Sequence, residues 1–313
     1  MSLQQTVARL VERLQPGSVA RDVPLERFTT YRVGGAAAAM VGVSDEAQLG
    51  VLAEVLAGDD VDVLVIGRGS NLVVSDHGWQ GIVVHLGKGF NEITEDGDRV
   101  RAGSAASLPV VANWCARRGL SGFEFTIAIP GSIGGAVRMN AGAHGREMAD
   151  ALAGARIVDL GTGTAIDRSP DSLGLGYRRS NLTDKEVVVH ADLGLAPRPQ
   201  SEIRGLMDTY RTHRAETQPA AAQNAGSVFQ NPPGDHAGRL VEAAGLKGFR
   251  VGGASVSTLH ANFFIADKGA PAQDVYDLVQ EVRKRVRDRS GIDLTPEIRF
   301  VGHFEERLEG VPR

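Results

Sequence analysis

The sequence predicts an α+β region up to about Pro197, followed by a smaller α/β domain. Three observations lead to this fold class. Helical and strand patterns of apolar residues alternate in the first third of the chain, and β-rich stretches occupy the middle. A proline-rich run, APRPQ at residues 196–200, then precedes two amphipathic helical patterns. With 42% hydrophobic and 23% charged residues, the composition is that of an ordinary globular protein.

The first third of the chain contains one predicted helix and three predicted strands. The helix lies between Ser44, which can cap it, and Gly58, which ends it. Its apolar positions have helical spacing and are Leu49, Leu52, Val55 and Leu56. The runs at residues 61–66 and 81–86 are typical of buried strands, and residues 100–102 predict a shorter strand.

The remaining elements are predicted in the same way, helices from the helical spacing of apolar residues and strands from apolar runs. Ser107 is the predicted cap of a helix that ends at Gly119. Residues 155–160 and 186–195 predict strands. An amphipathic helix follows the prolines, with the apolar residues Ile203, Leu206, Met207 and Tyr210. A last long helix is predicted from the stripe Val275, Leu278, Val279, Val282 and Val286.

Charge and cysteine content exclude several classes of protein. The 34 basic and 38 acidic residues give a net charge of −4, which argues against a nucleic-acid partner. The apolar stretch at residues 36–43 is too short to span a membrane, and the charged N-terminus does not resemble a signal peptide, so we expect a cytoplasmic protein. A single cysteine, Cys115, rules out an intramolecular disulfide. The scattered histidines have no metal-ligand spacing, and we expect no metal site.

Residues 67–71 form the first of three glycine-containing segments with a possible binding role. Gly67 and Gly69 follow an apolar strand, as in a dinucleotide-binding Rossmann loop. That interpretation fails because residues 72–74 continue as a β-branched strand and no helix begins here. Two alternatives remain: a nest of backbone N–H groups from Arg68 to Asn71 that binds an anion, or a glycine-rich hairpin turn.

The second segment covers residues 129–145 and is rich in glycine and alanine. Its small residues favour close contact with a ligand over core packing, although a long connecting loop is the simpler alternative. The third segment, residues 224–232, contains Ser227, which by itself is most simply a serine in a turn. Several glycine-rich loops in one chain indicate a large cofactor.

Taken in order, these and four further segments resemble the UDP-N-acetylenolpyruvoylglucosamine reductases, also called UDP-N-acetylmuramate dehydrogenases. The segments are FTTYRVGG (28–35), VIGRGSNLVVSD (65–76), GFEFTIAIPGSIGGAVRMNAGAHG (122–145), GYRRS (176–180), NAGSVFQNP (224–232), GRLVEAAGLKGFRVGGASVSTLHANF (238–263) and LTPEIRF (294–300). They extend over nearly the whole chain. The absence of an insertion after GYRRS resembles the shorter subclass of the family.

This resemblance implies an FAD-binding fold of the vanillyl-alcohol-oxidase type. It would consist of two α+β subdomains at residues 1–85 and 86–197, with FAD bound between them, and a C-terminal α/β substrate-binding domain at residues 198–313. The flavin contacts that the resemblance implies are Thr30, Gly67, Arg68, Gly69, Ser70, Asn71, Ile129, Pro130, Gly131, Ser132, Gly134, Gly135 and Asn140.

The resemblance also implies an activity, namely reduction of UDP-N-acetylglucosamine enolpyruvate to UDP-N-acetylmuramate for peptidoglycan synthesis. NADPH would be the co-substrate. The implied catalytic residues are Arg178, which holds the substrate carboxylate, Glu297, which assists it, and Ser227, which donates a proton. The implied substrate contacts, from motif position alone, are Tyr177, Gln230, Asn231, Lys247 and His260. We expect a monomer.

One residue departs from the family pattern, and two other functions compete. Gln230 stands where relatives often have lysine, so that position contributes no charge to substrate or NADPH binding. A flavin oxidase acting on an alcohol or sugar would keep the fold but react with oxygen. A nucleotide-binding module without activity would not need Arg178, Ser227 and Glu297, and their presence argues against it.

Overall fold

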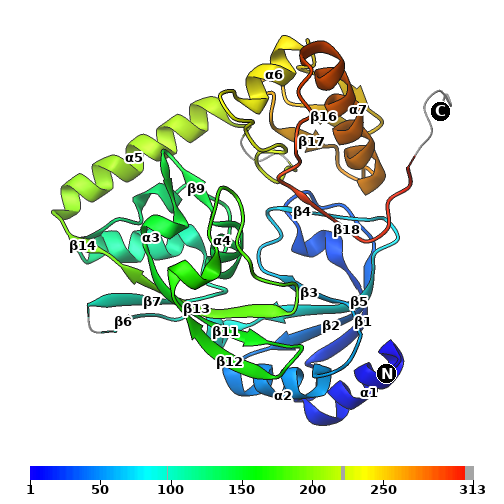
Figure 1. Cartoon of the computed structure of the whole chain (residues 1–313), viewed down its shortest axis with the longest axis vertical. Coiled ribbons are helices and arrows are strands. Elements are labelled where there is room, and N and C mark those ends of the chain that lie inside the picture. Colours follow the sequence, from blue (N-terminus) through cyan, green and yellow to red (C-terminus); the bar gives the residue numbers. More distant parts are fainter. Residues whose placement is uncertain (97, 220–222, 307–313) are drawn as a thin grey trace. The chain divides into compact units, whose positions relative to one another are not determined.

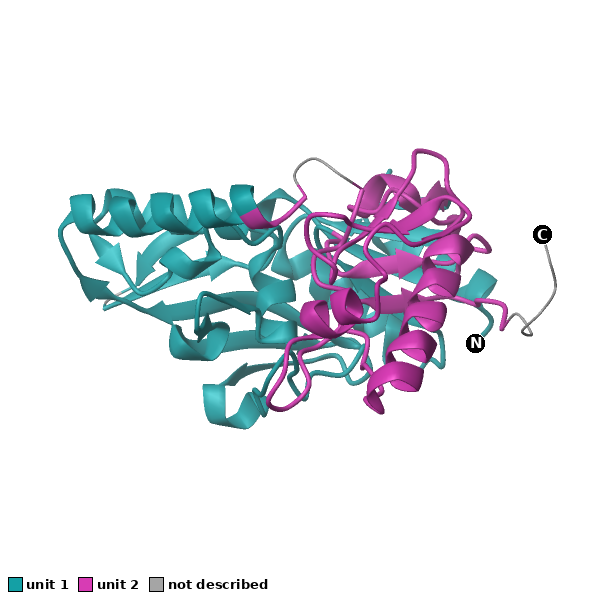
Figure 2. Ribbon diagram, turned by 90° about the horizontal axis from the view of Figure 1, so that it is seen from above, with its two compact units in different colours: residues 1–22, 39–68, 81–216 teal, residues 23–38, 69–80, 217–313 magenta. Residues whose placement is uncertain are grey.

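The computed structural model describes residues 1–96, 98–219 and 223–306, which form two compact units (Figure 2). Unit 1 consists of Met1–Asp22, Ala39–Arg68 and Gly81–Glu216, and unit 2 of Val23–Ala38, Gly69–Gln80 and Thr217–Arg313. Helices and strands are mixed in both units, as expected. The division into three domains with boundaries after residues 85 and 197 stays a prediction.

Unit 1 contains a five-stranded antiparallel sheet and most of a four-stranded sheet (Figure 1). The five-stranded sheet has the order β12 (Thr164–Arg168), β11 (Leu152–Asp159), β13 (Glu186–Gly194), β7 (Arg99–Gly103), β6 (Ile93–Asp96). The four-stranded sheet has the order β1 (Val19–Pro24), β2 (Ala36–Val43), β5 (Trp79–Leu86), β3 (Val63–Ile66). Two short antiparallel pairs join β14 (Ala196–Pro197) to β8 (Leu120–Ser121) and β10 (Arg146–Glu147) to β9 (Gly142–Ala143).

Helices cover both faces of the five-stranded sheet. This explains why its strand β13 contains the consecutive apolar residues 187–189. Figure 1 shows α3 and α4 on one side of this sheet and α2 on the other. Because side chains alternate along a strand, Val188 packs in the core with α3 and α4, whereas Val187 and Val189 pack in the core with α1 and α2. The helices of unit 1 are α1 (Leu3–Arg13), α2 (Glu46–Leu56), α3 (Leu108–Arg117), α4 (Ile133–Met139) and α5 (Gln200–Thr217). The 3-10 turns are η2 (Lys88–Phe90), η3 (Glu124–Thr126), η4 (Met148–Asp150) and η5 (Pro170–Leu173).

Unit 2 has its own apolar core around the long helix α7 (Ala272–Ser290). The predicted stripe from Val275 to Val286 is fully buried in this core, which confirms the sequence pattern. The carboxylate of Asp76 accepts the N–H groups of Ala272 and Gln273 at 2.8 and 3.0 Å and so caps the helix. The other elements are η1 (Leu25–Phe28), the parallel pair β4 (Leu72–Val74) and β18 (Arg299–Val301), α6 (Ala237–Ala243), and the antiparallel sheet β15 (Arg250–Val251), β16 (Ala254–Val256), β17 (Phe264–Ala266).

Two of the predicted local features differ from the structure. The prediction that Ser44 caps the first helix of the alternating region was wrong, because α2 begins one residue later, with Asp45 accepting the N–H of Gln48 at 2.8 Å. The hairpin interpretation of residues 67–71 was also wrong. The strand before this loop, β3, pairs in parallel with β5, whereas the strand after it, β4, pairs with β18. The loop therefore connects two different sheets.

Candidate active site

The glycine-rich residues 129–135 lie against Gly67 within unit 1. A Cβ atom on Gly67 would lie only 2.5 Å from the Oγ of Ser132, so a side chain there would require the Ser132 hydroxyl to move. The segment is fixed by backbone bonds from Leu108 N to Gly131 O at 3.0 Å and from Gly134 N to Ser104 O at 2.8 Å. Two segments that the resemblance assigns to flavin, one at residues 67–68 and one at residues 129–135, are thus adjacent.

Arg178 lies in a two-residue hairpin turn of unit 1. The N–H of Gly176 donates to the Arg179 carbonyl at 3.1 Å, and the reverse bond has the same length. Arg178 has φ +55°, in the left-handed region that residues other than glycine rarely adopt. Its Nη2 donates to the Gly142 carbonyl at 2.9 Å, and its Cζ lies 5.0 Å from the centre of the Tyr177 ring. Strained backbone of this kind concentrates at functional sites.

In unit 2, residues 69–71 pack against the segment that contains Thr30. Gly69 has φ +58°, and a Cβ atom there would overlap the Phe28 carbonyl and lie 2.7 Å from the Cα of Thr29. The Gly69 carbonyl accepts the N–H of Thr30 at 3.2 Å. Asn71 is linked to a catalytic candidate, because its Nδ2 donates to the carbonyl of Glu297 at 3.1 Å.

Ser227 and Glu297 lie on adjacent backbone segments of unit 2. The N–H of Glu297 donates to the carbonyl of Val228 at 2.7 Å, one residue beyond Ser227. On the other side, Ser227 pairs with Phe263 in an isolated β-bridge. The structure therefore brings these two predicted residues together. Arg178 belongs to unit 1.

Asn262 is a functional candidate that the sequence analysis did not single out. It is buried, its Oδ1 accepts the Phe229 N–H at 2.9 Å, and its Nδ2 donates to the Phe229 carbonyl at 2.8 Å. Its own carbonyl accepts the N–H of Val228 at 2.8 Å. Asn262 thus holds the segment that contains Ser227. Its place in the HANF motif was the available signal.

The predicted substrate contacts have varied surroundings. Tyr177 is exposed, and Gln230 is half-buried with its N–H bonded to Thr295 O at 2.9 Å. The Oδ1 of Asn231 accepts the N–H of Ala237 at 3.0 Å at the start of α6, and Lys247 forms an ion pair of 2.8 Å with Glu242. These partners give Asn231 and Lys247 structural contacts besides any contact with substrate.

His260 has a defined tautomer in unit 2. Its Nδ1 accepts the N–H of Asn262 at 3.2 Å, so in the neutral ring the proton lies on Nε2. Burial lowers the pKa of His260; a backbone hydrogen bond opposes this effect, and the charge of Lys247 adds a smaller lowering contribution. This histidine is therefore a neutral hydrogen-bond donor at Nε2, which suits contact with a carbonyl or phosphate oxygen.

The residues present fit a large polar cofactor. Among the residues that the structure describes, the buried hydroxyl of Thr30 has no hydrogen-bond partner, and neither has that of Ser104, which lies against Gly134. Buried polar atoms normally have partners, so each is a position that a bound ligand can satisfy. Ser104 was not predicted, and the small residues of GSAAS around it are the only sequence signal.

Within the described ranges there is no cluster of three or more His, Cys, Asp and Glu side chains that would hold a metal ion. Those ranges also contain no helix with the length and apolar character that a membrane span requires.

Comparison with known proteins identifies the family. Residues 37–169 match the FAD binding domain family, and residues 218–301 match the C-terminal domain of UDP-N-acetylenolpyruvoylglucosamine reductase. The UDP-N-acetylenolpyruvoylglucosamine reductase 2 of Symbiobacterium thermophilum is 43% identical over 94% of this chain and 97% of its own length. The chain belongs to the UDP-N-acetylenolpyruvoylglucosamine reductase family. The reductase of Bacillus subtilis is 39% identical over 96% of this chain and 99% of its own length.

A solved member of the reductase family has the same fold. The crystal structure of the Thermus caldophilus UDP-N-acetylenolpyruvylglucosamine reductase superposes with a TM-score of 0.79 and 36% identity, covering 91% of this chain and 99% of that one. The resemblance stated from the sequence motifs is confirmed. The α+β FAD-binding fold with an additional C-terminal domain is confirmed as well, and so is FAD as the cofactor.

Proposed function

We propose that this flavoprotein reduces the enolpyruvyl ether of UDP-N-acetylglucosamine enolpyruvate with NADPH and forms UDP-N-acetylmuramate, a peptidoglycan precursor. The observation that carries this proposal is family membership over nearly the whole chain, together with an FAD-binding domain. The presence of Arg178, Ser227 and Glu297 at the motif positions of the family supports it further.

FAD supplies the redox chemistry when bound, since it can take a hydride from NADPH and pass it to the terminal carbon of the enolpyruvyl group. In this proposal Thr30, Ser104 and the glycines at positions 67, 69 and 134 hold the cofactor. The buried hydroxyls of Thr30 and Ser104, which have no hydrogen-bond partner among the described residues, support that role.

Arg178 binds the carboxylate of the enolpyruvyl group. Hydride addition at the terminal carbon moves electron density from the double bond toward this carboxylate. A guanidinium with two N–H groups aligned on the carboxylate stabilises the developing charge, and a site closed to water strengthens the effect. The bond from Arg178 Nη2 to Gly142 O at 2.9 Å and the left-handed backbone restrict the positions open to this side chain. Glu297 assists, either as a protonated carboxyl group or through a water molecule.

Ser227 donates the proton that completes the reaction. The carbon bearing the ether oxygen carries the excess electron density after hydride transfer, and it takes the hydroxyl proton of Ser227. A serine alkoxide is a strong base in water, so neighbouring N–H or cationic groups must stabilise it. One hydride and one proton together convert the C=C bond to a C–C bond, which balances the reaction.

The test is an anaerobic titration followed by visible absorption. The purified protein should be yellow, lose its flavin absorption with NADPH, and regain it when UDP-N-acetylglucosamine enolpyruvate is added. Recovery with air and not with the enolpyruvyl sugar would favour a flavin oxidase. A colourless protein that cannot be reconstituted with FAD would contradict the proposal altogether.

A further inference from the structure

The hairpin that contains Arg178 is bonded at its base to the C-terminal end of α4. Asn140 follows this helix, and its Nδ2 donates to the carbonyl of Gly176 at 3.0 Å, the first residue of the hairpin turn. The Oδ1 of Asn140 accepts the N–H of Ala149 at 2.9 Å. Asn140 therefore joins three segments of unit 1 through one side chain: the end of α4, the Arg178 hairpin and the turn η4.

The conformation and burial of Asn140 suit this linking role. Its side chain is fully buried, and its backbone has φ +41° and ψ +54°, the left-handed conformation that asparagine tolerates better than most residues. Because both polar atoms of the amide bond to protein groups, the contact with flavin that the motif implied is not needed to explain this residue. The same segment contacts the arginine again through the Gly142 carbonyl.

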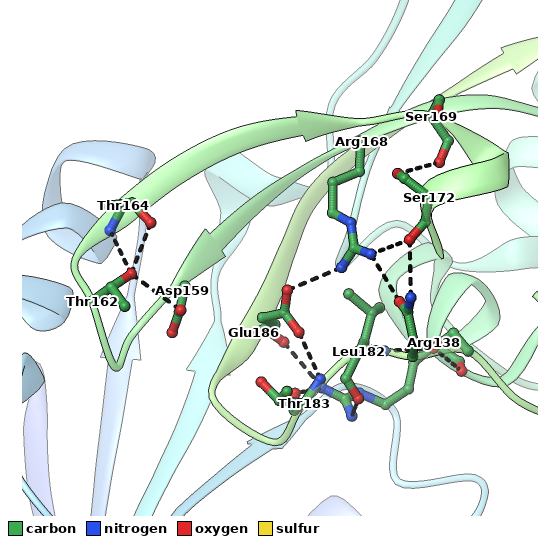
Figure 3. Close-up of polar contacts among 12 residues, drawn as sticks. Arg138, Asp159, Thr162, Thr164, Arg168, Ser169, Ser172, Leu182, Thr183 and Glu186 are labelled. Atoms are coloured by element: carbon green, nitrogen blue, oxygen red, sulfur yellow. Dashed lines mark hydrogen bonds and ion pairs between the residues drawn. The ribbon is translucent and has the colours of Figure 1, made fainter. Parts of the chain in front are cut away.

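The chain after the hairpin is bonded to the same helix (Figure 3). Arg138, in the last turn of α4, donates to the carbonyls of Leu182, Thr183 and Glu186 at 3.3, 2.6 and 3.0 Å. In return, the Ser180 hydroxyl donates to the Arg138 carbonyl at 2.7 Å. The end of α4 thus holds the chain both before and after Arg178.

A second cluster in Figure 3 fixes the outer part of this loop. Arg168, at the end of β12, forms an ion pair of 3.1 Å with Glu186, and both side chains are mostly buried. It also bonds to Asn181 Oδ1 at 2.9 Å and to the carbonyl of Ser172. This cluster bonds the loop to the sheet, whereas Asn140 and Arg138 bond it to the helix that begins with the flavin segment. Asn140 and Arg138, unlike the Arg168 cluster, therefore link the Arg178 hairpin to the segment at residues 129–135.

We infer that Asn140 is a positioning residue, which fixes the Arg178 guanidinium relative to the flavin-binding segment at the other end of α4. The inference rests on the proposed function, because it concerns the group that binds the substrate carboxylate. Misplacing a catalytic group by about 1 Å can reduce the rate about 100-fold. Loss of the Asn140 amide should therefore slow the step that uses Arg178 and leave the flavin in place.

The experiment compares the two half-reactions in Asn140→Gly, which removes the amide but keeps the left-handed backbone. Flavin content and the rate of flavin reduction by NADPH should stay within about twofold of the parent protein. Reoxidation by UDP-N-acetylglucosamine enolpyruvate should slow about 10- to 100-fold. Asn140→Asp is the second variant, since it keeps an acceptor for Ala149 N but replaces the donor to Gly176 by a carboxylate oxygen, which repels the Gly176 carbonyl. The matched control is Asn113→Ala, which removes an amide bonded to Pro109 O at 2.7 Å elsewhere in unit 1.

A double-mutant comparison tests whether Asn140 acts through Arg178. In an Arg178→Ala background, Asn140→Gly should cause no further slowing of reoxidation. Independent, multiplicative losses would overturn the inference, and so would unchanged reoxidation in the single variant. If both Asn140 variants lose FAD, the residue belongs to the flavin site and the inference is wrong. A parent protein that the enolpyruvyl sugar does not reoxidise would instead contradict the proposed function, and the inference with it.

Discussion

Replacing Gly69 by alanine should destabilise unit 2 and weaken FAD binding. Gly69 combines two constraints that an added methyl group violates. Its φ of +58° is unfavourable for alanine, and the space where a Cβ atom would lie is filled by the backbone of Phe28 and Thr29. The same backbone segment continues to Thr30, whose buried hydroxyl is a proposed flavin contact. A shift of this segment should therefore affect both stability and cofactor affinity.

The two constraints have separate magnitudes. The left-handed conformation costs an alanine about 1–2 kcal/mol. A Cβ atom at 2.7 Å from Thr29 Cα is roughly 1 Å closer than the usual carbon–carbon contact, and such overpacking costs about 1–3 kcal/mol. The expected loss in unfolding free energy is thus about 2–5 kcal/mol, a large share of the total stability of a typical domain.

Gly234→Ala is the control that separates these terms. Gly234 has φ +77° in the same unit, but no atom lies within 4 Å of its Cβ position. Both variants are made in a Trp114→Phe background, so that Trp79 of unit 2 is the only remaining tryptophan. Urea unfolding of the FAD-free proteins is followed by its fluorescence, and FAD affinity is measured separately.

The difference between the two variants decides the outcome. Gly234→Ala should lose about 1–2 kcal/mol and bind FAD like the parent. Equal losses in the two variants would refute the argument that the backbone of residues 28–29 closes the space at Gly69. An unchanged FAD affinity in a destabilised Gly69→Ala protein would refute the proposed flavin contact through this segment.

Three further predictions concern individual side chains. Ser227→Ala should keep flavin reduction by NADPH and lose most reoxidation by substrate, whereas Ser290→Ala should keep both; equal loss in both half-reactions would exclude Ser227 as proton donor. Arg178→Lys keeps the charge but loses the two-pronged geometry, and should lower substrate-dependent turnover about 100-fold, while Arg179→Lys in the same hairpin should change it less than twofold. Burial, and then the charge of His213, lower the pKa of His144. The unfolded chain therefore binds this proton first as the pH falls, and stability should decrease below about pH 6.5, by a small amount because the His144 side chain is exposed to solvent. His144→Asn should make the free energy of unfolding less dependent on pH between 7 and 5, and an unchanged dependence would contradict this role.

Periodicity was sufficient to predict the long helices and the buried strands. The stripe on α7 and the strand β13 follow directly from apolar spacing, because each element buries a regular face. Boundaries were less certain. At the start of α2, Ser44 and Asp45 are both good caps, and only the local backbone decides between them.

Long-range pairing was beyond the reach of local patterns. The sequence excluded a Rossmann loop at residues 67–71, but whether this loop closes a hairpin depends on the partners of its flanking strands. The partner of the strand before the loop, β5, follows soon after the loop in the chain, whereas the partner of the strand after it, β18, lies near the end of the chain. No local signal marks such a choice.

The candidate site shows the same limit for side chains. Motif position placed Asn140 and Asn231 among ligand contacts. In the structure their amides bond to Gly176, Ala149 and Ala237. A motif conveys that a residue type is required at a position, but asparagine meets equally well the needs of a ligand, a helix end or a turn. Asn262 and Ser104 were missed because their roles depend on burial.

The composition of unit 2 from separated stretches has a consequence for protein synthesis. Residues 23–38 and 69–80 contribute Tyr31, Val33 and Val73 to a core whose other members all lie beyond residue 224. The ribosome releases the chain from its N-terminus, so unit 1 is complete once Glu216 has emerged. The early stretches of unit 2 must then wait for α7 and β18. During that interval Tyr31, Val33 and Val73 have been synthesised but the residues that bury them have not.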